Sequence, residues 1–340
     1  MKACIFNPYL ETLGGGERYT VGVINSFSKK GYKVYIEWKD ESIVEKLEKR
    51  FGVSLEGVKA VESIERGDGY DACFWVSDGS IPTLRSRNNI LHFQVPFTNT
   101  SGRTLMNRMK LFRIKQVVCN SEFTKNFIDR EYGVNSKVVY PPVSVSQFKP
   151  GRKQNLICYI GRFSKLTQQK RQDVLIEVFK KFLKVNKNWK LVLAGGAEVG
   201  NGDFTQKLAK MARGYPIEIV LSPSFSEVKE IMGSAKLFWS ASGYGIDENK
   251  EPGKVEHFGI TVVEAMAARV IPLVHNKGGH KETVVHGENG YLWDKKSELL
   301  RYSLALADNY KSMKAMSVVA HRESKKYSED AFVNEFTKLI

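Results

Sequence analysis

The sequence predicts an α/β protein built from two parallel sheets, and three observations support this prediction. Short apolar runs rich in β-branched and aromatic residues alternate with helix-like stretches along the whole chain, which is typical of βαβ units. A stretch rich in proline and glycine, residues 140–151, interrupts this alternation. The chain of 340 residues is also long enough for two domains, each with its own core.

We expect the strands of the first domain at residues 3–6, 33–38, 57–61, 72–76, 90–93, 116–119 and 137–139. Those of the second domain are expected at 156–160, 190–194, 217–221, 236–240 and 270–274. Ser121 suits the N-cap of a helix that Gly133 ends. Further helices are expected over about 297–326, and a last helix at 328–340 would return to the first domain. The predicted domains are therefore residues 1–145, completed by 328–340, and residues 152–327.

The composition is that of a packed, enzyme-like protein, with 42% hydrophobic and 11% aromatic residues. Its longest apolar runs have the length of strands, well short of the roughly 20 residues of a spanning helix. The chain starts directly with a strand-like run and shows no signal peptide, so we expect a cytoplasmic protein. The cysteines are widely separated and lack metal-ligand or redox spacing, which predicts reduced core residues and no metal site. They are Cys4, Cys73, Cys119 and Cys158.

The net charge of +15 calls for an anionic partner, whether a nucleotide, nucleic acid or a membrane surface. No acidic residue occurs between Gly79 and Ser121. Within this stretch, Leu105, Met109 and Phe112 recur at helical spacing among cations, a pattern typical of a surface helix on anionic lipid. The alternative is a helix that merely covers a core. The cations that would contact a membrane or an acceptor phosphate are Arg103, Arg108, Lys110 and Arg113.

Residues 255–269, V-E-H-F-G-I-T-V-V-E-A-M-A-A-R, place two carboxylates around a glycine-centred turn. Positions eight apart on one helix are rotated by roughly 80°, so a regular helix would not aim both carboxylates at one point. We therefore expect a loop that carries Glu256, a turn at Gly259 and a helix that carries Glu264. The N–H groups that begin such a helix favour a phosphate. The alternative is an amphipathic helix with two solvated glutamates.

Other candidate residues follow predicted strands. Gly15 and Gly16 lie in a glycine-rich loop after the first strand, whose spacing fits neither a dinucleotide motif nor a P-loop and which is alternatively a flexible turn. Arg162 and Lys170 follow the first strand of the second domain, where they would hold a pyrophosphate without a metal, or belong to a solvated basic loop. His92 lies near the end of an apolar strand, so it either reaches a ligand or is a core residue.

Taken together, these elements resemble the retaining glycosyltransferases of family 4, which have the GT-B architecture of two facing Rossmann-like domains with a cleft between them. The most specific segments are Glu256-x7-Glu264, Gly161-Arg162 with Lys170, and H-N-K-G-G at 275–279. Within this family the chain is most similar to the cytosolic α-1,2-mannosyltransferases of lipid-linked oligosaccharide assembly. That similarity rests on N-P-Y at 7–9, G-G-G-E-R at 14–18, C-N-S at 119–121, V-Y-P-P at 139–142 and E-H-F-G-I at 256–260.

The resemblance implies that the first domain binds the acceptor and the second the nucleotide sugar. Glu256 would contact the donor sugar and Glu264 the ribose, while Arg162 and Lys170 would stabilise the departing diphosphate and His92 would orient the sugar ring. Glycines of the first loop would let donor and acceptor approach. The remaining implied donor-binding positions are Gly15, Gly16, His257, Phe258, Gly259, Ile260 and Thr261. Base selectivity is expected near 195–196 and 222–225, and the polar run 242–255 suggests a mobile flap.

The implied activity is retaining transfer of a hexose, mannose from GDP-mannose, to a hydroxyl of a glycan or lipid-linked glycan. It requires no cofactor besides the nucleotide sugar as donor. The alternatives are a UDP- or ADP-sugar transferase with another acceptor, a sugar-nucleotide epimerase or phosphorylase, and a basic nucleic-acid-binding module. The last of these leaves the paired glutamates unexplained and has no recognisable nucleic-acid motif, so nucleic acid is not the expected partner. The basic stretch would allow peripheral contact with the inner face of an anionic membrane.

Overall fold

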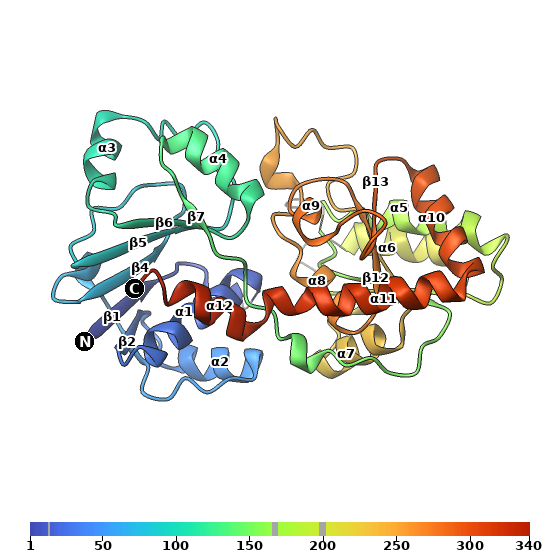
Figure 1. The fold of residues 1–340 in the computed structure, drawn as a ribbon, viewed down its shortest axis with the longest axis horizontal. Helices are drawn as coiled ribbons and strands as arrows, with labels where there is room; N and C mark the ends of the chain where they lie inside the picture. Colours follow the sequence, from blue (N-terminus) through green and yellow to red (C-terminus); the bar gives the residue numbers. More distant parts are fainter. Residues whose placement is uncertain (13, 165–168, 197–201) are drawn as a thin grey trace. The chain divides into compact units, whose positions relative to one another are not determined.

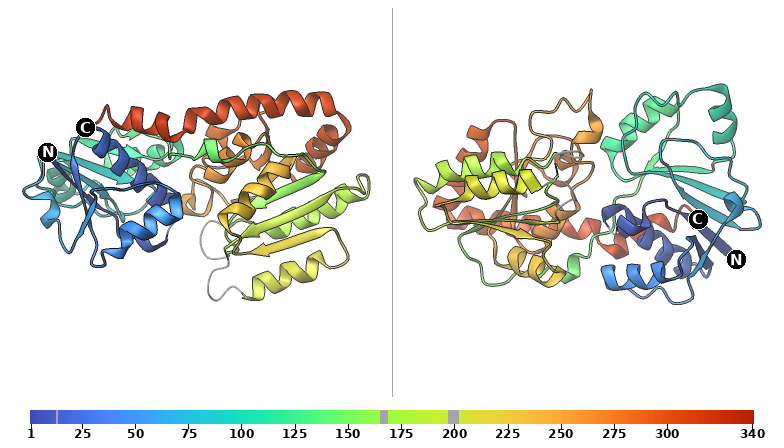
Figure 2. Two further views of the ribbon diagram at one scale, coloured as in Figure 1. Left: turned by 90° about the horizontal axis from the view of Figure 1, so that it is seen from below. Right: turned by 180° about the vertical axis from the view of Figure 1, so that it is seen from behind.

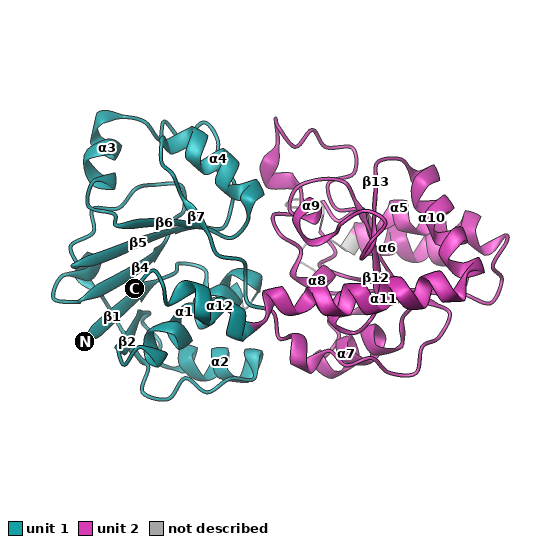
Figure 3. Cartoon of the chain, in the orientation of Figure 1, with its two compact units in different colours: residues 1–142, 329–340 teal, residues 143–328 magenta. Residues whose placement is uncertain are grey.

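The structure, a computed structural model, describes residues 1–12, 14–164, 169–196 and 202–340. The chain forms two compact units, which Figure 3 distinguishes by colour: unit 1 comprises residues 1–142 and 329–340, and unit 2 comprises residues 143–328. Each unit contains one sheet whose strands are all parallel, so the predicted α/β class is confirmed. The four cysteines are buried free thiols, as predicted. Of the helices in the described ranges, none combines the length and the apolar character needed to cross a membrane.

Unit 1 is built on a seven-stranded sheet with the order β3-β2-β1-β4-β5-β6-β7. All seven predicted strands are present, shifted by at most a few residues at their ends. The order reverses between β1 and β4, which is the switch point of a doubly wound sheet. The strands are β1 (Lys2–Phe6), β2 (Lys33–Glu37), β3 (Lys59–Val61), β4 (Ala72–Val76), β5 (Asn88–Phe93), β6 (Gln116–Cys119) and β7 (Lys137–Val138).

Helices lie on both faces of this sheet, as the ribbon views show (Figures 1 and 2). One face carries α1 (Gly15–Lys29), α2 (Ser42–Phe51) and α12 (Glu329–Phe336), and the other carries α3 (Leu105–Leu111) and α4 (Glu122–Tyr132). The last helix therefore belongs to unit 1. Gly22 of α1 allows α12 to approach closely, because a Cβ at this position would lie 2.7 Å from the Phe332 ring.

The predicted caps of α4 are confirmed. The hydroxyl of Ser121 accepts a hydrogen bond from the backbone N–H of Thr124 at 3.0 Å, and Gly133 ends the helix with a left-handed φ of 68°. Both groups satisfy backbone polar atoms that the helix itself leaves unpaired.

Unit 2 has a six-stranded sheet with the order β10-β9-β8-β11-β12-β13. Five of its strands were predicted. The sixth was missed because it has only three residues and a partly exposed face, which gives little periodicity. The strands are β8 (Leu156–Ile160), β9 (Lys190–Gly195), β10 (Ile217–Leu221), β11 (Leu237–Ser240), β12 (Ile271–His275) and β13 (Tyr291–Trp293).

The helices of unit 2 cover this sheet and enclose the larger hydrophobic core of the chain. Figure 1 shows α11 as a long helix beside α8. The helices are α5 (Gln172–Leu183), α6 (Gly202–Ala212), α7 (Phe225–Ser234), α8 (Ile260–Ala267), α9 (His280–Thr283), α10 (Lys296–Asp308) and α11 (Tyr310–Ser324).

The carboxyl ends of α7 and α8 are joined by one lysine. The ammonium group of Lys153 donates to the carbonyl oxygens of Ala235 at 2.8 Å and Ala268 at 2.7 Å, next to the last turns of the two helices. Burial lowers the pKa of Lys153 to about 8. A cation at these carbonyl-rich ends stabilises both helices and fixes the position of α8.

Candidate functional site

The switch point of the second sheet lies between β8 and β11, where ligands bind in open parallel sheets. Gly161 directly follows β8, and Ser242 lies two residues beyond β11. The residues that gather around these two strand ends come from segments far apart in the sequence.

A buried ion pair lies at this switch point. The Nζ atom of Lys170 is 2.6 Å from Oε2 of Glu256, and the Ser242 hydroxyl donates to the same oxygen at 3.3 Å. The side chains of Lys170 and Glu256 are only 10% and 17% exposed. Burial alone would raise the pKa of Glu256, but the Lys170 ammonium outweighs it and the pKa is lowered to about 2. The carboxylate is therefore ionised at neutral pH and accepts hydrogen bonds only.

The segment around the two glutamates has the predicted form of a loop that runs into a helix. Glu256 lies on the loop, Gly259 turns the chain with a left-handed φ of 97°, and α8 begins at Ile260. Glu264 lies in α8 and is buried. The alternative of one amphipathic helix with two solvated glutamates is wrong, because the first carboxylate precedes the helix and both side chains are shielded. The ligand roles of these residues stay predictions.

The other predicted donor-binding positions beside Glu256 are mostly shielded by their own unit. The His257 and Phe258 side chains are buried, and the Phe258 ring packs edge-on against Tyr327 with centroids 5.3 Å apart. Ile260 and Thr261 provide the first N–H groups of α8, which have no acceptor within a helix. This position suits an anion, and the binding of a donor phosphate there stays a prediction.

Two glycines of the H-N-K-G-G segment pack directly against this loop. A Cβ at Gly278 would lie 2.1 Å from the carbonyl oxygen of Glu256, and one at Gly279 would lie 2.3 Å from that of His257. The N–H of Gly279 donates to the Glu256 carbonyl at 2.8 Å. Only glycine permits this approach, so the turn fixes the backbone that carries the Glu256 carboxylate.

His280, which follows these glycines, is fully buried beside the ion pair. Its Nδ1–H donates to the carbonyl oxygen of His275 at 2.8 Å, which leaves Nε2 as an acceptor. Within the described part of the chain, Nε2 has no hydrogen-bond partner. Burial lowers the pKa of His280 to about 4, although the nearby Glu256 carboxylate opposes this. The imidazole is therefore neutral at physiological pH.

Arg162 follows β8 and has an exposed side chain, while its carbonyl oxygen accepts from Nε2 of Gln172 at 2.9 Å. The glycines around it are sterically required. A Cβ at Gly161 would lie 2.2 Å from the Tyr159 hydroxyl, and one at Gly195 would lie 2.0 Å from the Gly161 carbonyl oxygen. Residues 165–168, between Arg162 and Lys170, lie outside the described residues, as do residues 197–201.

The segments expected to select the base meet in unit 2. The Ser222 N–H donates to the carbonyl oxygen of Gly195 at 2.8 Å, and Ser222 has a left-handed φ of 52°. Gly196 faces open space, since a Cβ there would meet no atom within 4 Å. The arrangement brings residues 195–196 and 222–225 together, and their role in base selection stays a prediction.

The polar run 242–255, expected as a mobile flap, is tied down at two points. Arg171 donates to the carbonyl oxygen of Tyr244 at 2.8 Å and forms a bidentate ion pair with Asp173. The Glu248 carboxylate accepts from the N–H of Gly278 at 2.6 Å and pairs with Lys281 at 2.8 Å. These contacts anchor the loop, and the hydrogen bond to Gly278 joins it to the glycine turn.

In unit 1, the glycine loop and His92 lie near the carboxyl ends of β1 and β5. A Cβ at Gly16 would lie 2.3 Å from Oε1 of Gln94, while Gly15 begins α1. His92 is completely buried, with its ring stacked on Tyr19 at 4.0 Å and its Nδ1–H donating to the Val118 carbonyl at 3.1 Å. Burial lowers the pKa of His92 to about 3. These surroundings match the alternative of a core histidine, and its contact with a sugar stays a prediction.

The four cations expected at a membrane or acceptor differ in their surroundings. Arg103 donates to the carbonyl oxygen of Arg130 at 2.7 Å and Arg113 to that of Leu84 at 2.9 Å, so both are tied to the backbone of unit 1. Arg108 and Lys110 lie on α3. No residue of α3 is fully buried, and Leu111 alone among its apolar side chains packs partly against the small core around β5 and β6. The contact of the four cations with a membrane or an acceptor stays a prediction.

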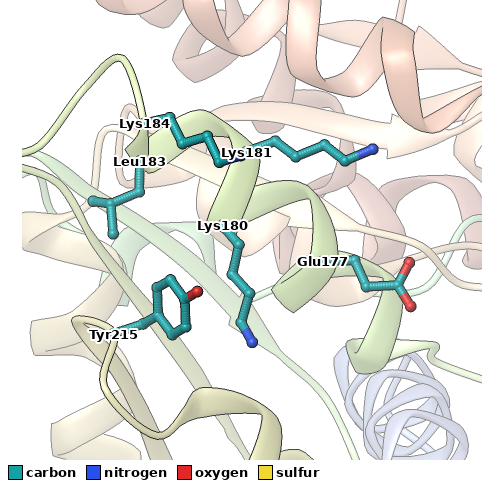
Figure 4. Close-up of a pocket in the computed structure, with 6 residues that line it drawn as sticks. All are labelled: Glu177, Lys180, Lys181, Leu183, Lys184 and Tyr215. Atoms are coloured by element: carbon teal, nitrogen blue, oxygen red, sulfur yellow. The ribbon is translucent and has the colours of Figure 1, made fainter.

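A separate hollow of about 610 Å³ lies in unit 2, near the amino end of β10 (Figure 4). It is lined by the last turns of α5 and by Tyr215, which directly precedes β10, with the Lys180 ammonium 4.3 Å from the Tyr215 ring centre. Because ligands of open parallel sheets bind at the carboxyl ends of strands, this hollow is not the candidate site.

The fold and the switch-point site define an α/β protein with two Rossmann-like units, one of which places a carboxylate, a lysine and a helix N-terminus together. Residues 144–321, more than half of the chain, match the family described as glycosyl transferases group 1. The chain therefore belongs to this family, and the resemblance noted in the sequence is confirmed.

Curated relatives of the chain include enzymes with more than one named activity. The GDP-Man:Man(3)GlcNAc(2)-PP-Dol alpha-1,2-mannosyltransferase of Dictyostelium discoideum is 27% identical over 300 residues, which cover 78% of this chain and 57% of that protein. The Mus musculus enzyme of the same name is 29% identical over 52% of this chain and 37% of its own length. A probable sucrose-phosphate synthase of Thermosipho melanesiensis is 24% identical over 61% of this chain and 45% of its own. The chain thus matches about half the length of these relatives or less.

Solved structures of low sequence identity share the fold over nearly the whole chain. A glycosyltransferase from Rickettsia africae superposes with a TM-score of 0.78 at 17% identity and covers 99% of this chain and 97% of its own. Anabaena HepE in complex with UDP and glucose gives 0.74 at 16% identity, covering 99% and 98%. This likeness confirms the predicted GT-B fold class.

Several residues of the site were missed by sequence reasoning. Ser242 and His280 lie beside Glu256, and Arg171 and Glu248 hold the loop that leads to it. A sequence signal existed for Ser242, which follows a buried strand, and for His280, which follows two adjacent glycines. The direct pairing of Lys170 with Glu256 had no such signal, because 86 residues separate them.

Proposed function

We propose that the chain is a retaining hexosyltransferase that moves mannose from GDP-mannose to a hydroxyl of a glycan or lipid-linked glycan. The observation that carries this proposal is the Lys170–Glu256 pair at the switch point of the second sheet, beside the start of α8. The names of the mannosyltransferase relatives support the choice of GDP-mannose.

The Glu256 carboxylate has one oxygen left for a ligand. Oε2 accepts from Lys170 and Ser242, whereas Oε1 has no hydrogen-bond partner among the residues that the structure describes. Oε1 therefore accepts hydrogen bonds from hydroxyls of the donor sugar. With a pKa of about 2 the carboxylate carries its full negative charge, which stabilises the positive charge that develops on the sugar in the transition state. It does not act as a proton donor.

The diphosphate of the donor binds at the first turn of α8. The N–H groups of Ile260 and Thr261 and the positive end of the helix dipole favour negative charge there. Arg162 and Lys170 supply the cations that stabilise the leaving diphosphate, with Arg162 following β8 and Lys170 oriented by its pair with Glu256. Glu264, four residues into α8, binds the ribose. This chemistry requires no metal.

Unit 1 provides the acceptor site, and Gly15, Gly16 and His92 lie near the carboxyl ends of its first and fifth strands. A lipid-linked acceptor would bring the protein to the cytoplasmic face of a membrane.

The proposal is tested with purified protein and a panel of GDP-mannose, UDP-glucose, UDP-N-acetylglucosamine and ADP-glucose. We expect turnover and the tightest binding with GDP-mannose, and loss of transfer by at least about a hundredfold in Glu256→Gln, which keeps the shape but removes the charge. Glu288→Gln, at an exposed loop position, is the matched control and keeps full activity. Selective turnover of a UDP- or ADP-sugar would refute the donor assignment, and a fully active, folded Glu256→Gln variant would refute the site.

A further inference from the structure

Helix α3 exposes its apolar side chains instead of burying them. The exposed fractions are 76% for Leu105, 61% for Met106, 63% for Met109 and 92% for Phe112, which caps the helix. At about 100° per residue these four positions fall within an arc of about 120° on the helix surface. Leu111, on the opposite side, is the residue that packs against the small core around β5 and β6. The apolar stripe therefore faces away from unit 1.

Two cations flank this stripe, one on each side. In the same projection, Arg108 lies about 40° beyond one edge and Lys110 about 40° beyond the other. Among the described residues, neither has a carboxylate partner, and the same is true of Lys115. Residues 79–121 contain no aspartate or glutamate, so no acidic neighbour in the sequence offsets the positive charge of these three side chains.

Polar contacts hold the helix in this orientation. The Thr104 hydroxyl accepts from the N–H of Asn107 at the start of α3, and Arg113, just beyond its end, donates to the carbonyl oxygen of Leu84 at 2.9 Å. Before the helix, Arg103 is bonded to the end of α4. The exposed stripe is thus a feature of an anchored helix and not of a loose segment.

We propose that the α3 surface, defined as Leu105, Met106, Met109 and Phe112 with Arg108 and Lys110, inserts into the anionic leaflet of a lipid bilayer. An apolar stripe between two cations fits a flat boundary in which acyl chains lie beneath a layer of phosphates. A polyanion such as nucleic acid would satisfy the cations but would leave the four apolar side chains in water. The six side chains together therefore favour lipid over a soluble polyanion.

Binding to sedimented vesicles tests this surface with the full chain and without donor or acceptor, so failure here is distinct from failure of the proposed transfer. Wild-type protein is expected to bind vesicles of phosphatidylcholine with phosphatidylserine and not those of phosphatidylcholine alone. Arg108→Gln with Lys110→Gln should weaken binding about 25-fold, since each cation near an anionic leaflet is worth about fivefold. Leu105→Ser with Phe112→Ser should weaken it by roughly tenfold or more.

The matched control lies on another helix of the chain. Tyr310 is 67% exposed and is followed by the exposed Lys311 and Lys314, so Tyr310→Ser with Lys311→Gln and Lys314→Gln removes a similar apolar group and two charges. This variant should bind within about twofold of wild type, because those groups do not belong to the α3 surface. Thermal unfolding confirms that each variant is folded.

Insertion itself is measured with an environment-sensitive fluorophore on Met106→Cys. The four native cysteines are buried, so the introduced thiol reacts selectively. Its emission should shift to the blue with anionic vesicles, whereas the same label on Val185→Cys, at a position 66% exposed in unit 2, should not respond.

Several results would overturn the proposal. These are no binding of wild-type protein to anionic vesicles, equal binding to neutral ones, or α3 variants that bind like the Tyr310 control. Loss of binding in the charge variant alone, with an unresponsive label at Met106→Cys, would show purely electrostatic adsorption. Self-association that the Phe112 variant abolishes would assign the surface to a second copy of the chain.

Discussion

Lys170→Met is the substitution that most directly tests the physical basis of the site. Methionine keeps most of the buried stem but removes the ammonium that lies 2.6 Å from Glu256. The pKa of Glu256 is about 2 instead of 4.5, which corresponds to roughly 3 kcal/mol of net stabilisation of the ionised form. Since burial alone acts in the opposite direction, removing the lysine should cost about 3 to 5 kcal/mol of unfolding free energy, as is usual when one partner of a buried pair is lost.

The assay is urea unfolding at pH 7, followed by tryptophan emission. Three tryptophans, Trp189, Trp239 and Trp293, are buried in unit 2 and report on its unfolding. Adding Glu256→Gln to Lys170→Met should recover much of the lost stability, because no uncompensated charge is then buried. The control is Lys281→Met, whose side chain is 43% exposed and pairs with Glu248, and it should cost less than about 1 kcal/mol.

The same pair predicts a change in the sign of the pH dependence. In the wild type the folded-state pKa of Glu256 lies below the unfolded value, so its stabilisation is complete above about pH 4.5 and is lost as the pH falls towards about 2. In Lys170→Met, burial dominates and raises the pKa, so Glu256 should destabilise the fold as the pH rises through 4.5. A variant within 1 kcal/mol of wild type at pH 7, with an unchanged acid profile, would refute the reasoning.

Two further predictions concern the glycine turn and the buried histidines. Gly278→Ala should cost about 2 kcal/mol or more and weaken donor binding, because its Cβ would overlap the Glu256 carbonyl oxygen, whereas Gly253→Ala, where a Cβ meets no atom within 4 Å, should be neutral in urea unfolding and donor titration. His92 and His280 have pKa values of about 3 and 4, below the usual 6.5, so unfolding takes up protons as the pH falls below 6.5. Each should lower the unfolding free energy by about 1.4 kcal/mol per pH unit between 6 and 4.5. If the His280→Gln variant lost unfolding free energy with falling pH as steeply as the wild type, the contribution assigned to His280 would be refuted.

The strands and the form of the glutamate segment could be predicted because their signals are local. Buried parallel strands appear as short apolar runs, and rotation of 100° per residue was enough to place Glu256 before a helix and Glu264 within it. The pairing of Lys170 with Glu256 could not be predicted in this way. It depends on β8 and β11 being neighbours, and the spatial order of strands is not written in their sequence order.

The anchoring of residues 242–255 shows a second limit. The run is polar and contains glycine and proline, so its composition indicates a loop but says nothing about its mobility. The run is restrained by the hydrogen bond from the Arg171 side chain to the Tyr244 carbonyl oxygen and by the one from the Gly278 N–H to Glu248, both of which join distant segments of the chain. A loop fixed at both points is suited to hold Ser242 and Glu256 in place.

Helix α3 shows why periodicity alone cannot assign a function. The spacing of Leu105, Met109 and Phe112 is equally that of a helix on a core and of a helix on a membrane, because the pattern specifies a stripe but not the direction in which it faces. The direction is decided by Leu111 and by the polar contacts at both ends of the helix. Since a folded protein gains nothing from exposing four large apolar side chains, their exposure on an anchored helix between two uncompensated cations is explained by a partner outside the chain. We propose the anionic bilayer as this partner, because its layers match that order of apolar and charged groups.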